Sequence, residues 1–457
     1  MIQTIRNAWA VPELRKKILF TVFALLIFRL GAAIPVPYIN AEGLEQYLAG
    51  QSGTILGLMN AMSGSAFALA TVFALSIQPY INSSIIIQLL TVAIPALERL
   101  AKEGGEEGRK KIASITRYTT VLIALIQGFG YYTLIKSYGL IDNEGLSNLW
   151  VGLVIVLSFT AGSAFLMWLG EQITEFGIGN GISIILFAGI ISRLPQMVSD
   201  MVKGVQYHSL LQDAEVKAAL GETLVAQYEK MALAPWMIPI ILIGGLAMIV
   251  FIVFINNAER KIPVQYAKRV VGRKMYGGQS THIPMKVSMS GVMPVIFAQS
   301  IASLPATLLM FFGITQESEG FWGGFLRIFN STSILYAIIY FLLIIFFSYF
   351  YSTIQFSPIE VANNLKKNGG FIPGFRAGKP TSEFIQKVLN KITLFGAIYL
   401  GIIAVVPILI SCFSESAANS GISLGGTSII IVVGVALETV KALEGQMLMR
   451  HYKGFLE

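Results

Sequence analysis

The sequence is poor in the residues on which most enzymes and metal sites depend. Asp, Glu, Lys and Arg make up only 13% of its 457 residues, against about 25% in soluble domains. The single cysteine, Cys412, excludes an intramolecular disulfide. Three scattered histidines, His208, His282 and His451, argue against a metal cluster. The sequence also lacks a Walker-type phosphate loop and a Gly-x-Ser-x-Gly nucleophile elbow.

Acidic residues are nearly absent from the apolar runs. Glu438 is the clearest exception, while Glu171, Glu175 and Glu360 lie at the ends of such runs. Ion-coupled carriers need ionisable groups near the middle of the membrane. The sequence therefore gives little support to an enzyme or to an ion-coupled carrier.

Long hydrophobic runs are what the sequence has in abundance. Hydrophobic residues make up 54% of the chain, the mean hydropathy is +0.69, and a spanning helix needs about 20 apolar residues. These values predict a polytopic membrane protein with ten spans. The predicted spans are Ile18–Pro35, Thr71–Ile94, Tyr118–Ile135, Leu149–Leu169, Ile182–Val198, Trp236–Ile255, Val292–Phe312, Ile334–Phe356, Ile392–Cys412 and Thr427–Leu443. The first run resembles a signal peptide, but nine further spans favour a retained helix.

Basic residues are distributed unevenly between the connections. If the N-terminus is inside, 26 of the 33 Lys and Arg residues lie in inner segments. Positive residues concentrate on the cytoplasmic side of membrane proteins. The pattern predicts that both termini are cytoplasmic.

Ten spans divide into two sets of five, and an odd number in each set gives the two sets opposite topology. We expect an N-terminal half of residues 1–198, an external hinge segment of residues 199–235 and a C-terminal half of residues 236–457. The sequence shows no convincing residue-level repeat, so this division is a topological inference.

The stretch Ser63–Ala93 is the most informative part of the chain. It opens with small residues, which bury little apolar area, and continues as an apolar run that holds Pro79 and several polar residues. Polar groups in a spanning helix should face protein or water, and Pro79 favours a kink. We interpret the stretch as a movable small-residue segment followed by a pore-lining helix. An ordinary kinked bundle helix after a loop would fit the same residues.

Two inner loops, residues 256–290 and 357–391, are longer than a simple connection requires. Their Lys and Arg fit the positive-inside pattern, but their length and their Gly, Pro and aromatic residues do not follow from it. Projecting basic loops suit an acidic partner, such as a docked protein or ribosomal RNA.

Several long segments, in order, resemble the SecY family, which forms the central subunit of bacterial protein-conducting channels. The resemblance covers the whole chain except the segment Asp200–Ala234. The segments are FALSIQPYINSSIIIQLLTV (73–92), EGRKKIASITRY (107–118), WLGEQITEFGIGNGISIILFAGI (168–190), GGQSTHIPMKV (277–287), NNLKKNGGFIPGFRAGKPT (363–381) and GGTSIIIVVGVALE (425–438).

The resemblance implies an all-α polytopic fold, with ten transmembrane helices in two inverted halves around an hourglass pore. The family has an aliphatic pore ring, which matches Ile77, Ile81, Ile182, Leu186, Ile296 and Ile431. It also has a plug, at about residues 56–69, where we expect contributions from Leu56, Met59, Asn60, Met62, Ser63, Gly64, Ser65 and Phe67. Independently, Ile77 and Ile81, and also Ile182 and Leu186, are each four apart and so share a helix face.

The family opens sideways between its second and seventh helices. The resemblance implies a lateral gate here between residues 73–94 and 292–312, with candidates Asn82, Ile86, Gln127, Ala298 and Gln299. A plain packing role for each polar residue fits equally well. For docking, the candidates are Lys268, Arg269, Arg273, Lys274, Arg376 and Lys379.

The resemblance also implies partners. They are SecE, SecG, the SecA motor, the ribosome, signal peptides, unfolded substrate chains and anionic lipids. The chain itself has no nucleotide site, so we expect no cofactor and a passive channel driven by its partners in the bacterial cytoplasmic membrane. Two other classes fit the composition: an inverted-repeat secondary transporter for small solutes, which needs a midplane substrate site, and an intramembrane enzyme, which needs a paired nucleophile and base.

Overall fold

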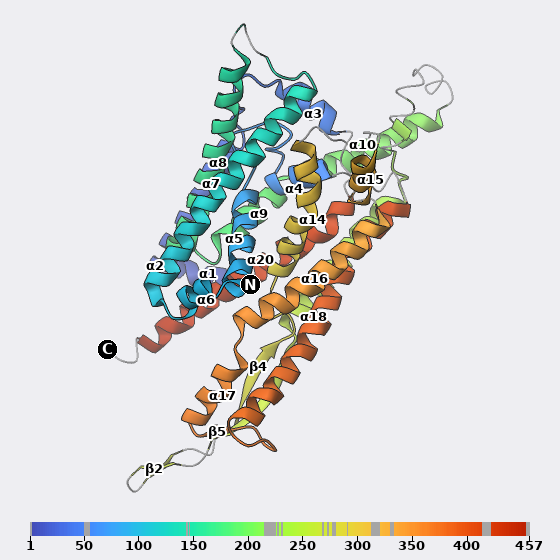
Figure 1. Ribbon diagram of the computed structural model, residues 1–457. Coiled ribbons are helices and arrows are strands. Elements are labelled where there is room, and N and C mark those ends of the chain that lie inside the picture. The colour runs from blue at the N-terminus through green and yellow to red at the C-terminus, as the bar shows by residue number, and fades with distance from the viewer. Residues whose placement is uncertain are drawn as a thin grey trace.

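The structure is a computed structural model of the chain (Figure 1). It describes residues 2–49, 55–142, 145, 147–213, 225, 228–229, 232–266, 269–271, 274–276, 280–289, 291–311, 320–329, 333–413 and 422–453.

Long apolar helices account for most of the described chain. Seven of them are long and apolar enough to cross a membrane, and a bent pair, α5 with α6, makes an eighth. Two further predicted spans fall on α2 and on α14, a shorter apolar helix. The ten predicted runs thus each fall on a helix, which is consistent with ten spans. The helices concerned are α2 (Pro12–Gly31), α5 (Gln78–Ala93), α7 (Gly105–Ser137), α8 (Asn148–Phe176), α9 (Gly181–Ser192) with α10 (Leu194–Gln212), α13 (Met237–Asn257), α14 (Met293–Phe311), α16 (Ile334–Gln355), α18 (Lys379–Phe413) and α20 (Ile422–Lys453).

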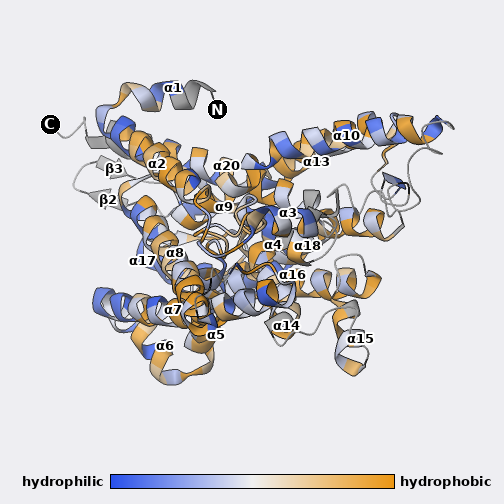
Figure 2. Cartoon of the chain, turned by 90° about the horizontal axis from the view of Figure 1, so that it is seen from above, coloured by the Kyte–Doolittle hydropathy of each residue, from blue (hydrophilic) through white to orange (hydrophobic). Residues whose placement is uncertain are grey.

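Apolar side chains also cover the outside of the bundle. On α2, Val22, Phe23 and Leu26 are exposed, and on α13 so are Leu242 and Ile243. Figure 2 shows orange, hydrophobic residues along α2 and α7. A soluble protein rarely exposes contiguous apolar patches of this kind, so these faces suit a lipid environment.

The second predicted span begins later than the sequence indicated. Residues 64–77 form turns, and α5 starts only at Gln78, with Pro79 in its first turn. A proline there loses no helical hydrogen bond, because the first N–H groups of a helix have no partner within it. The expected kink at Pro79 is therefore wrong. The chain bends instead by 106° between α5 and α6 (Pro95–Lys102), at Pro95.

Short helices and turns occupy one end of the bundle. Figure 1 shows α3 (Ala41–Ala49), α4 (Ile55–Ser63), α10 and α15 (Phe321–Ile328) toward this end. Elements of the long basic loops, α17 (Pro358–Lys367), β4 (Ser280–Lys286) and β5 (Gly370–Phe371), lie toward the opposite end. Another helix, α1 (Ile2–Ala10), packs against α2 and α20.

The two long basic loops contain a small sheet, which the sequence did not predict. Strand β1 (Glu259–Tyr266) pairs antiparallel with β4 (Ser280–Lys286) on one side and with β5 (Gly370–Phe371) on the other. The tip of the hairpin carries the pair β2 (Arg269–Val271) and β3 (Lys274–Tyr276). Ile262, Met285, Ile372 and Leu389 share one buried cluster beneath the sheet. The two loops thus form one structural unit.

The largest hydrophobic core joins helices from both predicted halves. It contains residues of α2, α5, α8 and α9 from the first half, and of α13, α14, α16, α18 and α20 from the second. The division into residues 1–198 and 236–457 remains a prediction.

Candidate functional site

An aliphatic cluster lies where the two predicted halves meet. Five of the six predicted ring residues are almost completely buried, with exposed fractions of 0–3%, and the sixth, Ile182, is half-buried against them. They come from α9, α14, α20 and the start of α5, and all six belong to the largest hydrophobic core or pack against it. The five buried residues are Ile77, Ile81, Leu186, Ile296 and Ile431.

Helix α9 shows how this cluster is placed relative to its surroundings. Asn180, just before the helix, lines a polar cavity. Leu186, in the middle, belongs to the aliphatic cluster. Gly189 and Ser192, at the far end, face the plug segment at Gly64. Along one helix, a polar cavity, buried aliphatic residues and the predicted plug segment therefore follow one another.

The plug segment packs into the bundle rather than lying on its surface. Among the predicted plug residues, five are buried and three half-buried. The buried ones are Leu56, Met62, Ser63, Gly64 and Phe67, and the half-buried ones are Met59, Asn60 and Ser65. Met62 belongs to the same core cluster as the aliphatic residues of the constriction.

Local hydrogen bonds hold the turn that follows α4. The Ser63 hydroxyl accepts from the Phe67 amide at 3.0 Å, and the Asn60 side chain accepts from the Ala68 amide at 3.0 Å. The Phe67 ring stacks on Tyr131 of α7 with centroids 4.4 Å apart, and the Tyr131 hydroxyl donates to the Phe67 carbonyl. Tyr131 was not among the sequence candidates, because nothing in the sequence connects it with residue 67.

Gly64 is the closest point between the plug segment and α9. Its φ is +68°, and a Cβ there would lie 2.7 Å from Ser192 Oγ and 2.9 Å from the Gly189 carbonyl oxygen. Glycine adopts such a φ without the steric cost that other residues meet. Only glycine therefore fits both the backbone and the space at this position.

The predicted lateral gate is the contact between α5 and α14. One buried hydrogen bond crosses it, from Gln78 Nε2 to Ser300 Oγ at 3.3 Å. Three of the predicted gate residues, Asn82, Gln127 and Gln299, are buried, and their side-chain carbonyl oxygens have no hydrogen-bond partner in the described part of the chain. Unpartnered buried oxygens stabilise a contact little, so apolar packing and the Gln78–Ser300 bond hold the two helices together.

The other two gate candidates do not lie level with each other. α5 leads into α6 at one end of the molecule and α14 leads toward α15 at the other, so the two helices are antiparallel (Figure 1). Measured from the Gln78–Ser300 bond, Ile86 lies about 12 Å further along α5, and Ala298 only about 3 Å along α14 in the same direction. Ile86 and Ala298 therefore lie at different levels of the contact, and Gln78 and Ser300 are the pair joined across it by a hydrogen bond.

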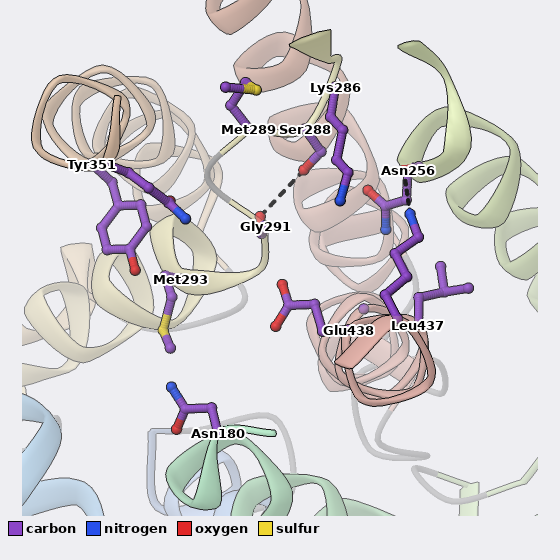
Figure 3. Close-up of a pocket in the computed structure, with 13 residues that line it drawn as sticks. Asn180, Asn256, Lys286, Ser288, Met289, Gly291, Met293, Tyr351, Leu437 and Glu438 are labelled. Atoms are coloured by element: carbon purple, nitrogen blue, oxygen red, sulfur yellow. Dashed lines mark hydrogen bonds between the residues drawn. The ribbon is translucent and has the colours of Figure 1, made fainter. Parts of the chain in front are cut away.

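The polar cavity below the aliphatic cluster has a volume of about 270 Å³. It is lined by residues from the ends of α13, α14 and α16, from the middle of α20, and by Lys286 of β4. In Figure 3 the Glu438 carboxylate points into it. Lys441 donates from Nζ to the Asn256 carbonyl at 3.3 Å at its edge. The sequence marked Glu438 as an acid in an apolar run, but not as part of this cavity.

The predicted docking residues divide into those that the structure describes and those that it does not. Lys268 and Arg273 lie outside the described residues, and of Arg269 and Lys274 only the backbone is described, in β2 and β3. Arg376 and Lys379 are exposed.

The Arg376 turn has a well-fixed backbone. The Arg376 carbonyl accepts from Thr381 Oγ1 at 2.7 Å, and the neighbouring Phe375 ring packs on Phe384 at 4.2 Å. The Lys379 ammonium lies 4.0 Å from the Glu383 carboxylate, and both side chains are exposed. These contacts hold the turn, on which the Arg376 side chain is exposed.

Possible metal ligands do not gather anywhere in the described ranges. No group of three or more His, Cys, Asp or Glu side chains there could hold a metal ion.

Comparisons with known proteins agree on one family. The SecY family model matches residues 71–440. A curated relative from Streptomyces coelicolor, named protein translocase subunit SecY, is 41% identical over the full length of both chains.

Among solved structures, one concerns the SecY plug domain, which is described as stabilising the closed state of that channel. It matches with a TM-score of 0.60 at 18% identity and covers 97% of each chain. Sec61 from a canine ribosome-channel complex matches with a TM-score of 0.57 at 17% identity, again over 97% of each chain.

Proposed function

This chain belongs to the SecY family, and we propose that it is the channel subunit of a protein translocase in the bacterial cytoplasmic membrane. It passes unfolded secretory chains across the membrane and releases apolar helices sideways into lipid. The observation that carries this proposal is the order along α9 of the polar cavity, the buried aliphatic residues and the predicted plug segment. The secondary-transporter alternative is not favoured, because the family and the fold are those of protein-conducting channels.

The six aliphatic residues form the seal of the resting channel. A narrow apolar passage empties of water and so blocks ions, and flexible aliphatic side chains can close around a passing chain. Met62 of the plug segment packs into the same cluster. Displacement of the plug therefore removes one wall of the seal and opens the passage.

The lateral exit lies between α5 and α14. Interhelical polar bonds in membranes average only about 0.6 kcal/mol, and one buried bond, Gln78 to Ser300, crosses this contact in the described structure. An apolar signal peptide can replace the packing that is lost when the two helices separate. Opening the gate thus costs little free energy when an apolar segment binds, and the gate remains closed otherwise.

The joined basic loops form the cytoplasmic docking face, and both termini are cytoplasmic. Supporting this orientation, the elements of these loops lie together toward one end of the molecule (Figure 1). The SecA motor or the ribosome docks there and supplies the energy, with Arg376 as a central contact. SecE and SecG complete the membrane complex, and anionic lipids face the basic inner rim.

Reconstitution tests the proposal. The chain, purified with its small partner subunits and placed in vesicles, should carry a denatured precursor protein into the lumen when SecA and ATP are added outside. A folded, crosslinked form of the same precursor is the matched control and should stay outside. Uptake of small solutes without uptake of the precursor would contradict the proposal.

A further inference from the structure

The end of α13 is the point where the membrane bundle meets the sheet of the basic loops. We call the strands β1, β4 and β5 the docking sheet. Asn256 is the second-last residue of α13 and lies at the edge of the polar cavity (Figure 3). β1 begins three residues later, at Glu259. Between them, the Ala258 carbonyl accepts a hydrogen bond at 3.0 Å from the amide of Val287, which directly follows β4. Both long strands of the docking sheet therefore join the bundle here.

Little else fixes the position of α13. Of its 21 residues, only Ile252 and Ile255 are buried, and both lie near the end that leads into the docking sheet. The rest of the helix is largely exposed, and added Cβ atoms on Gly244 and Gly245 would meet nothing within 4 Å. The contacts of this one end thus determine where α13 holds the first strand.

Two other helices bind Asn256 at this end. The Tyr399 hydroxyl of α18 donates to Asn256 Oδ1 at 2.8 Å, and Lys441 Nζ of α20 donates to the Asn256 carbonyl at 3.3 Å. That carbonyl is one of the last four of α13, which have no partner within the helix, and a cation near a helix C-terminus is also favourable. We call Asn256, Tyr399 and Lys441 the Asn256 cluster. It joins α13, α18 and α20 beside the docking sheet.

Backbone contacts place α18 tightly against both the docking sheet and α20. A Cβ on Gly396 of α18 would lie 2.6 Å from the Val287 carbonyl oxygen, and a Cβ on Gly426 of α20 would lie 2.9 Å from the Ile403 carbonyl oxygen of α18. Gly396 is three residues before Tyr399 and so shares its helix face. The hydrogen bonds of the Asn256 cluster therefore form where the elements already fit closely.

The same helix α20 also reaches the constriction. Ile431 is almost completely buried in the largest core, and Lys441 follows it on one unbroken helix. The ten residues between them correspond to about 15 Å. A displacement of Lys441 is thus also a displacement of a residue of the constriction.

We propose that the Asn256 cluster fixes the docking sheet to α20, so that Tyr399 and Lys441 are positioning residues through which a docked partner shifts the constriction. The inference rests on the proposed docking function of the basic loops. A partner that moves the docking sheet moves Asn256, and the two hydrogen bonds pass this movement to α18 and α20. Without them, the sheet moves on its own and Ile431 stays in place.

A distance measurement tests whether the cluster fixes the sheet. With Cys412 replaced by serine, spin labels are attached to Gln265→Cys, which is exposed on β1, and to Gly445→Cys on α20, where an added Cβ meets nothing within 4 Å. Pulsed electron paramagnetic resonance in vesicles then gives the distribution of distances between the sheet and α20. We expect Tyr399→Phe combined with Lys441→Met to broaden this distribution.

Conservative and control variants separate positioning from a general loss of structure. Lys441→Arg keeps a charged donor and should keep the distribution of the parent. Lys391→Met removes an exposed ammonium from α18, and Tyr349→Phe removes a hydroxyl that donates to the Asn390 carbonyl at 3.2 Å; neither should change it. A distribution for the Tyr399 and Lys441 double variant that equals that of the parent, or one that the two controls broaden as much, would overturn the proposal.

Ion conductance measures the effect on the constriction without any transported chain. SecA with a non-hydrolysable ATP analogue is added to the parent in planar bilayers, and the rise in conductance is recorded. Each lost hydrogen bond should lower this rise about threefold, the worth of a typical interhelical polar bond in a membrane. The affinity for SecA should change less than twofold, because the docking residues are untouched. An unchanged rise in the double variant would contradict the coupling.

The parent itself separates this inference from the proposed function. If it binds SecA without any rise in conductance, the coupling is wrong. Export of a precursor by vesicles that contain the same parent shows independently whether the chain is a translocase channel.

Discussion

Gly64→Ala should shift the plug segment from its position against α9 toward a displaced position. A Cβ at this position would lie 2.9 Å from the Gly189 carbonyl oxygen, and no side-chain rotation can relieve an overlap with backbone. Its φ of +68° raises the conformational free energy of a non-glycine residue at this position by about 1 kcal/mol. The overlap disappears whenever the segment leaves α9, so the two effects together favour the displaced segment by at least about 1.4 kcal/mol, or tenfold.

The assay is ion conductance through the resting channel in planar bilayers. We expect Gly64→Ala to raise the time spent open about tenfold, while insertion into the membrane stays normal. Gly105→Ala is the matched control, because Gly105 has a similar φ of +55° but nothing within 4 Å of the added Cβ. If the Gly64→Ala channel conducts no more ions at rest than the parent, or if Gly105→Ala raises the resting conductance as much as Gly64→Ala does, contact with α9 does not hold the plug closed.

Two further predictions concern the constriction and the docking face. Ile81→Ser combined with Ile431→Ser should make the resting channel conduct ions, because two hydroxyls let water enter the passage. The measurement is ion conductance in planar bilayers. If the double variant conducts no more than the parent, these two residues are not part of the seal. Arg376→Glu should lower SecA-driven export more than tenfold, since loss of a buried charged contact costs about 2–5 kcal/mol, whereas Lys379→Ala should be mild. Normal export by the glutamate variant at limiting SecA would refute the docking role.

Much of the fold followed from apolar length alone. A run of about 20 apolar residues has few options other than a spanning helix, and each of the ten predicted runs overlaps one helix or, for residues 182–198, two consecutive helices. Where the sequence misled, the reason was local. Pro79 starts a helix in one position and kinks it in another, and the sequence does not say which of these positions it occupies.

The sheet in the basic loops was not predicted from the sequence, for a different reason. Strand β1 pairs with β5, more than 100 residues later in the chain, and such pairings leave no periodic signal over a long segment. Apolar residues do alternate in KIPVQY (261–266), but the run is short and Pro263 within it argues against a strand.

The constriction was only partly predictable from residue spacing. The pairs Ile77 with Ile81 and Ile182 with Leu186 share helix faces by spacing, but Ile431 came only from the resemblance to the SecY family. Glu438 stood out as a lone acid in an apolar run. Its place in the polar cavity depends on how α20 packs against α13, α14 and α16, and no local pattern shows that.

Photocrosslinking of a stalled chain tests the central claim most directly. A photoreactive amino acid is placed at Ile81, in the constriction, or at Ile243, whose side chain is 68% exposed on the outside of α13. A secretory chain arrested halfway through the channel by a folded domain should crosslink to position 81 and not to position 243. Crosslinks at position 243 without any at position 81 would show that the chain does not pass between the two halves.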